Sequence, residues 1–182
     1  MARTKRQPTA GDMIRSLAVI LVPILVITAL MTRTPDDHPV NVVDYVPVLA
    51  EARREAPYPV LAPANLPVEW RPTRVSWTKA GDTGLNEVRS IRNQWQLGYL
   101  TPNDIFIGLT QGDLEPRELI KDQTRVGLPD GESHVNEATW QRLVSADERT
   151  RSLVLSTPQV TTIVSGDTSY EALESYAVTL KP

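Results

Sequence analysis

Few side chains in this sequence combine the types and the spacing that catalysis or metal binding requires. The chain has two histidines, His38 and His134, and neither has a second ligand-type side chain at helical or hairpin spacing. The absence of cysteine excludes disulfides, thiolate metal sites and cysteine nucleophiles. We therefore predict that the protein holds no metal ion and no cofactor.

Two kinds of motif resemble catalytic ones, but each has a simpler structural explanation. The stretch Ser165-Gly-Asp-Thr-Ser169 has hydrolase-like residues, yet a strand end followed by a capped helix explains every one of them. The acid pairs within 115–118 and 147–148 suit glycosidic chemistry, but each lies in a segment that we expect to be solvated. We predict that the protein is not an enzyme. The catalytic alternative is a hydrolase that uses His134 as its base.

Aromatic and basic side chains between residues 70 and 92 are the candidates for binding. Trp70 follows a proline in an irregular stretch, so we expect it to be partly exposed, whereas Trp95 and Trp140 suit the core. Several arginines alternate with apolar positions and would then line one open sheet face, as a docking surface for an anionic partner. The alternative is an ordinary solvated sheet face. The predicted binding residues are Trp70, Arg71, Arg74, Arg89 and Arg92.

An apolar segment precedes the elements that must position these residues. The first fifteen residues carry four basic side chains and one acid, and the next sixteen carry no charge. At 1.5 Å per residue, a helix of about 20 residues matches the ~30 Å hydrocarbon core of a bilayer. We predict a basic cytoplasmic tail over 1–12, a transmembrane helix over 13–32, a linker over 33–45 and an extracytoplasmic α+β domain over 46–182.

The basic flank sets the predicted orientation of this anchor. Because basic residues stay on the cytoplasmic side, the N-terminus is expected in the cytoplasm and the domain outside the cell membrane. The lipid bilayer is then a partner through residues 13–32. Two alternatives remain open: a cleaved secretory signal, for which 27–32 is a poor cleavage site, and a buried core helix. The formal charge of -3 argues against nucleic acid as a partner.

Beyond residue 66 the hydrophobic pattern changes to the period of two that is typical of strands. A helix is expected over 46–56, another over 114–123, and a third after a Thr168–Glu171 capping box, with a loop over 127–133. Strands are expected over 73–78, 87–91, 94–100, 105–111, 138–144, 152–156 and 161–165. This order predicts the α+β class, with an antiparallel β-sheet covered by helices.

Several stretches together resemble a known family. They are the basic N-terminus with its anchor, Leu66–Thr73, Trp95–Pro102, Thr139–Leu143 and Thr162–Ser169. Their order and spacing resemble the actinobacterial membrane-protein family called domain of unknown function 4245, over about residues 12–180. The resemblance implies a single-span protein with an extracytoplasmic domain and supplies no catalytic or ligand residues. Glu69 stands where that family usually has glycine. The element order also looks like the Mog1/PsbP-like fold.

The combination of an anchor, a folded domain and no catalytic constellation predicts an interaction or accessory module. It would be a single-pass membrane protein that docks a membrane protein complex or a cell-envelope component. The alternative is a domain that binds a small molecule or a lipid between the sheet and its helices. A gap fully packed by Trp95, Leu97 and Tyr99 would count against that alternative.

Overall fold

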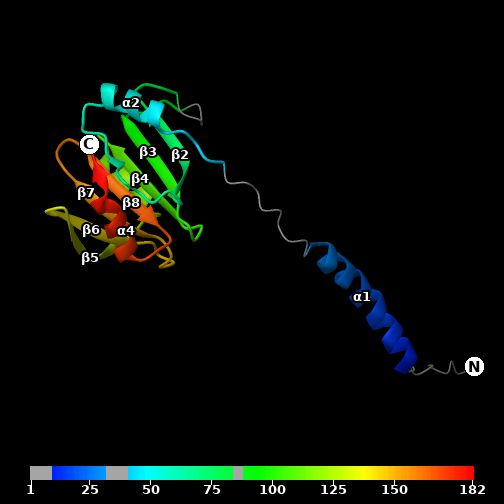
Figure 1. Ribbon diagram of the computed structural model, residues 1–182. Coiled ribbons are helices and arrows are strands. Elements are labelled where there is room, and N and C mark those ends of the chain that lie inside the picture. Colours follow the sequence, from blue (N-terminus) through cyan, green and yellow to red (C-terminus); the bar gives the residue numbers. More distant parts are fainter. Residues whose placement is uncertain (1–9, 32–40, 84–87) are drawn as a thin grey trace, which may run out of the picture. The chain divides into compact units, whose positions relative to one another are not determined.

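The computed structural model of the protein describes residues 10–31, 41–83 and 88–182 (Figure 1). The chain divides into two units, Met1–Pro39 and Val40–Pro182. In the first unit, helix α1 runs over Ala10–Met31 and contains Pro23. Most of the predicted linker lies outside the described residues.

Most of the predicted membrane span lies in helix α1. Among the described residues, no helix is long and apolar enough to qualify as a membrane span. The transmembrane helix predicted over 13–32 is therefore not supported by the structure and stays a prediction.

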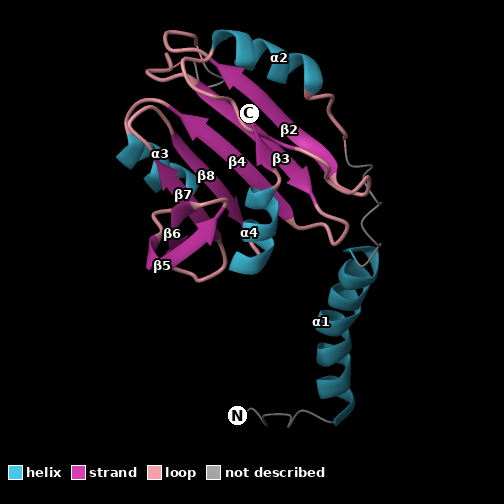
Figure 2. Cartoon of the chain, turned by 60° about the vertical axis from the view of Figure 1, so that its left-hand side comes forward, coloured by secondary structure: helices cyan, strands magenta, loops and turns pink. Residues whose placement is uncertain are grey.

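The second unit is built on a seven-stranded antiparallel sheet (Figure 2), which confirms the predicted α+β class. Its strand order is β2-β3-β4-β8-β7-β6-β5, and β1 and β9 form a separate two-stranded sheet. The strands are β1 Ala62–Pro63, β2 Arg71–Thr78, β3 Gln94–Leu100, β4 Phe106–Gly112, β5 Leu128–Val135, β6 Ala138–Val144, β7 Arg151–Ser156, β8 Thr161–Gly166 and β9 Leu180–Lys181. The helices are α2 Val46–Glu55, α3 Pro116–Gln123 and α4 Tyr170–Val178.

Alternate residues of the strands point into two different cores. On one face, Trp95, Leu97 and Tyr99 of β3 pack with Leu173 and Tyr176 of α4 in a large buried cluster. Helix α2 contributes to the same cluster, as the apolar stripes of α2 and α4 require. The burial of Trp95 and Trp140 there confirms their predicted place in the core.

The opposite face of the sheet is covered only in part. Leu119 of α3 packs there on Leu143, Val154 and Ile163, which come from β6, β7 and β8. Val154 and Ile163 are directly paired across β7 and β8, so α3 covers this half of the face. The half formed by β2, β3 and β4 holds mainly polar side chains and glycines.

A buried glutamine ties the segment before β2 to the sheet. Gln111 is 1% exposed, its Oε1 accepts a hydrogen bond from the Leu61 amide at 2.8 Å, and its Nε2 donates to Pro59 O and to Thr162 Oγ1. The Trp95 indole N–H also donates to Leu61 O at 2.9 Å. These bonds fix the extended chain that leads to residues 66–70.

Three local predictions need correction. The segment 127–133, predicted as a loop, forms most of β5, because it pairs with β6 despite its proline and glycine, with a register shift between Pro129 and Glu132. Residues 88–91 contain only an isolated bridge to Thr83, and 84–87 lie outside the described residues. The hydroxyl that caps α4 belongs to Ser169, which accepts from the Ala172 amide.

Candidate functional site

An apolar pocket of about 450 Å³ opens beside the main core. Three segments far apart in the sequence form it: the stretch 66–70, the β3–β4 turn over 101–105, and helix α4. Its lining residues are Leu66, Pro67, Trp70, Thr101, Pro102, Asn103, Ile105, Ile107, Thr168, Ala172, Ser175, Tyr176 and Thr179. Its volume falls in the range of about 300–1,000 Å³ that is typical of ligand sites.

Local hydrogen bonds fix the two loops of this pocket. The Trp70 amide donates to Pro67 O at 3.0 Å, which closes a tight turn and places the Trp70 indole against Tyr176. In the β3–β4 turn, the amide of Ile105 donates to the Thr101 hydroxyl, and the Thr101 amide donates to Ile105 O. Both loops are therefore held by their own internal hydrogen bonds.

Stacked aromatic rings form one wall of the pocket. The rings of Trp70 and Tyr176 lie parallel, with centroids 5.8 Å apart and an interplanar angle of 12°. Tyr99 meets Trp70 edge-on at 6.4 Å and also contacts Tyr176. Such pairs add about 0.5–1.5 kcal/mol each beyond the area that they bury. The wall is thus rigid and joined to the core.

The hydroxyl of Tyr176 is the unusual polar group of this wall. Tyr176 is 1% exposed, and among the described residues its hydroxyl has no hydrogen-bond partner. Burial, and to a smaller extent the nearby Tyr45, raise the pKa of Tyr176 above its usual value, so the group stays neutral. A buried donor without a partner costs free energy, so the Tyr176 hydroxyl slightly destabilises the fold at this wall of the pocket.

The chemistry of the pocket is neutral. Within the described residues, its lining contains no acidic, basic or histidine side chain, and its few polar groups are hydroxyls and the amide of Asn103. Val68, between the lining residues Pro67 and Trp70, is 91% exposed. A charged ligand would lose its hydration here without gaining a counter-charge, whereas an apolar group would gain contact area.

Of the arginines that were predicted to line one face, Arg71 and Arg74 do lie on the same face of β2, because of a register shift between them, whereas the other two lie apart from them. Arg74 pairs with Gly98, whereas Arg92 precedes Gln94, so at least four residues of β3, about 13 Å, lie between them. Arg89 is exposed in the connection between β2 and β3.

Two of these arginines also have acidic partners. Arg71 forms an ion pair with Asp104, and Arg92 lies 3.5 Å from a carboxylate oxygen of Glu115. Of the five predicted binding residues, only Trp70 lines the apolar pocket.

The pocket does not lie where a ligand site was predicted. Trp95, Leu97 and Tyr99 are each at most 3% exposed and fill the space between the sheet and its helices. This packing counts against a ligand in the sheet–helix gap. The pocket lies instead at the margin of the core, where the Trp70–Tyr176 pair forms one of its walls.

The residues considered for catalysis or metal binding do not assemble. Among the described residues, no three acidic or histidine side chains are placed to hold a metal ion. The ring of His134 is exposed, with Nδ1 3.2 Å from the Thr139 hydroxyl, and His38 lies outside the described residues. Asp147 bonds the Ser145 hydroxyl, which lowers the pKa of Asp147 and explains its place in a turn.

Most of the pocket could not be found from the sequence. Ile105, Ala172 and Ser175 have ordinary residue types, and only the fold brings them to Trp70. The one useful signal was a tryptophan in a proline-containing stretch outside the regular strands.

Comparisons with known proteins give a family but no activity. No curated protein matches the sequence. A chain of the MucA/MucB complex of Pseudomonas aeruginosa is similar at 15% identity and a TM-score of 0.38. The similarity covers 67% of the present chain and 34% of the Pseudomonas chain, so the present chain spans about a third of that chain's length. The family model "Protein of unknown function (DUF4245)" matches residues 5–180, and the chain therefore belongs to this family.

Proposed function

We propose that this protein is a non-catalytic accessory module tethered to the cell membrane, whose pocket at Trp70 holds the acyl chain of an envelope lipid. The observation that carries the proposal is the neutral, largely apolar pocket of about 450 Å³ with its Trp70–Tyr176 wall. The proposal keeps the predicted accessory role and joins to it the alternative prediction of a bound lipid, which it places at the margin of the core and not between the sheet and its helices.

An acyl chain suits the pocket better than a charged ligand does. Each buried methylene contributes about 0.8 kcal/mol, so a few carbons in the pocket give useful affinity without any ion pair. Ser175 and Thr179 already donate their hydroxyl protons to the carbonyls of Glu171 and Tyr176, whereas the hydroxyl of Thr168, which also lines the pocket, can donate to the ester region of a lipid. The exposed Val68 offers a further apolar contact at its mouth.

The proposed tether rests on the sequence. Residues 16–31 are uncharged and follow a basic segment, the pattern of a signal anchor with its N-terminus in the cytoplasm. Fourteen residues, 32–45, separate this run from α2, and an extended chain of that length spans at most about 50 Å. Under this proposal the domain stays close to the outer surface of the cell membrane, where lipid is the abundant apolar ligand.

The tether is tested by fractionation and surface proteolysis. We expect the full chain in the membrane fraction, resistant to alkaline extraction, with its domain accessible to protease added to intact cells. A variant that starts at residue 33 should leave that fraction. A full chain that is washed off by alkali, or a domain that is protected in intact cells, would contradict the proposed topology.

The pocket is tested by the lipid that purifies with the protein. The full chain is isolated in mild detergent and its bound lipid is identified by mass spectrometry. We expect Ala172→Phe to empty the pocket, because Ala172 lines it, whereas Val178→Phe adds the same ring at an exposed position of the same helix. Equal lipid in both variants would rule out this site. A cross-linked protein partner lost only in Ala172→Phe would replace lipid as the occupant.

A further inference from the structure

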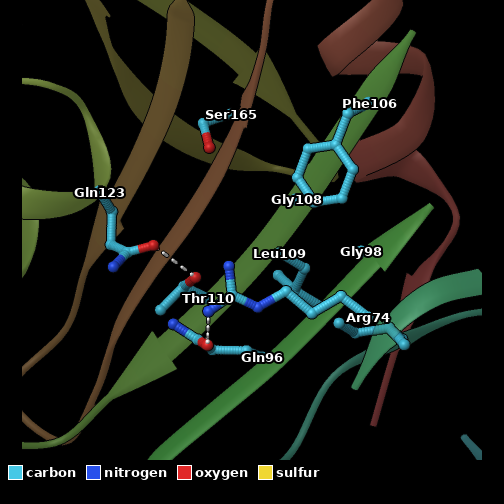
Figure 3. A pocket seen from close by; sticks show the side chains of 10 residues that line it. Arg74, Gln96, Gly98, Phe106, Gly108, Leu109, Thr110, Gln123 and Ser165 are labelled. Atoms are coloured by element: carbon cyan, nitrogen blue, oxygen red, sulfur yellow. Dashed lines mark hydrogen bonds between the residues drawn. The ribbon is translucent and has the colours of Figure 1, made fainter. Parts of the chain in front are cut away.

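A second hollow lies on the opposite sheet face, in the part that α3 leaves uncovered. A groove of about 600 Å³ runs past Arg74, Phe106 and Gln123, and a smaller hollow of about 40 Å³ continues from it over β3 and β4 (Figure 3). Arg74 of β2 and Phe106 of β4 occupy strand positions that alternate with those of the main core, and Gln123 ends helix α3. The groove therefore lies on the other sheet face from the main core, and of its lining residues only Ile105 also lines the pocket at Trp70.

The floor of the groove is an aromatic ring that lies on two glycines. Phe106 is the only phenylalanine of the chain and is 42% exposed. A Cβ added at Gly98 would overlap its ring, and one at Gly108 would lie 3.1 Å from it, so the ring rests on the backbone of β3 and β4. The two glycines thus give the ring a flat seat, and one ring face remains for a ligand.

Planar polar groups line the hollow to one side of this ring, near Thr110 (Figure 3). Gln123 accepts a hydrogen bond from the Thr110 hydroxyl at 3.1 Å, and Gln96 accepts from Arg74 at 2.9 Å. Each amide uses its oxygen in these bonds, so its NH₂ group can donate to a ligand. Ser165 adds a hydroxyl at the groove wall (Figure 3). The groove thus offers donors and acceptors around an apolar platform.

The charges of the groove largely cancel. Two of its three aspartates have arginine partners outside it: Asp104 pairs with Arg71, and Asp167 lies 3.7 Å from Arg149. The third, Asp122, lines the groove together with two arginines, Arg74 and Arg125. A strongly ionic ligand would therefore find both attraction and repulsion, whereas neutral hydroxyl groups can use either kind of partner.

We propose that this groove binds a neutral saccharide. A pyranose ring has an apolar face of C–H groups, which stacks on the negative face of an aromatic ring, and a rim of hydroxyls that donate and accept. Phe106 supplies the platform, and Gln96, Gln123 and Arg74 supply the surrounding bonds. The site is open along the sheet, so it suits a segment of a longer glycan.

The test is saturation-transfer NMR on the full chain in phosphatidylcholine nanodiscs, which contain no sugar detergent to compete. The probes are the linear tetrasaccharides of glucose, N-acetylglucosamine and arabinose. We expect at least one probe to receive saturation from the protein. Phe106→Ala should weaken its binding about 10-fold, the loss expected for one stacked aromatic contact.

Further variants keep the result interpretable. Phe106→Tyr retains the platform and should keep the wild-type affinity within about 3-fold. Gln123→Ala should also weaken binding, and it serves as the test should Phe106→Ala fail to fold. Leu128→Ala removes another exposed apolar side chain, on β5, and should have no effect. Absence of saturation for all three probes at millimolar concentration would overturn the proposal. So would equal binding by wild type, Phe106→Ala and Gln123→Ala.

Discussion

Replacing Gln111 by leucine should destabilise the domain far more than an ordinary surface change does. Leucine keeps most of the side-chain volume but removes all three hydrogen bonds that Gln111 makes to Leu61, Pro59 and Thr162. The substitution therefore tests the polar clamp rather than packing.

The magnitude follows from the burial of the partners. Thr162 is 3% exposed and the Leu61 amide is part-buried, so in the variant both lose a hydrogen-bond partner that water does not easily replace. Pro59 is exposed, so its carbonyl can accept a hydrogen bond from water instead. Each abandoned buried group costs about 1–3 kcal/mol. With two such groups, the free energy of unfolding should fall by roughly 2–6 kcal/mol.

Urea unfolding of the unit Val40–Pro182 measures this loss, with Gln141→Leu as the matched control. Gln141 lies on β6, is exposed, and its replacement should change stability by no more than about 0.5 kcal/mol. If Gln111→Leu lost no more stability than Gln141→Leu, the clamp would not hold the segment that carries Trp70.

Two further predictions concern stability. The hydrogen bond from the Ser133 hydroxyl, and then that from Arg142, lower the pKa of Glu174. The contribution of ionised Glu174 to the stability of the domain is therefore complete above its ordinary pKa of 4.5 and is lost as the pH falls through the lowered pKa. Glu174→Gln should cost about 1–2 kcal/mol at pH 7 and much less at pH 3 in urea unfolding, and an equal loss at both values would refute the assignment. Gly166→Ala should cost about 1–3 kcal/mol, because its Cβ would lie 2.8 Å from Phe106 O, and an unchanged melting temperature would contradict this clash.

Regular elements were predictable where the side-chain pattern and the burial agree. Trp95, Leu97 and Tyr99 alternate with polar residues in β3, and all three are buried on one face. In α4, Leu173, Tyr176 and Ala177 form the expected buried stripe. Local pattern and tertiary packing point the same way at these positions.

The same reasoning failed where pairing overrode local signals. Pro129 and Gly131 are typical of loops, yet they lie in β5, because an edge strand tolerates a missing donor and a shifted register. Of the residues that line the two hollows, the sequence pointed to only Trp70 and Arg74 as binding residues, since each hollow is made by segments that only the fold brings together. The actinobacterial origin and the Mog1/PsbP-like fold stay predictions.

Fluorescence quenching by brominated lipids tests the central claim most directly. Trp70 lines the pocket, so the difference between wild type and Trp70→Phe isolates its signal from those of the other three tryptophans. The full chain is placed in vesicles of phosphatidylcholine with brominated acyl chains. We predict strong quenching of Trp70 that is abolished by Ala172→Phe and retained by Val178→Phe. Quenching that is absent in wild type, or unchanged by Ala172→Phe, would contradict a lipid chain in this pocket.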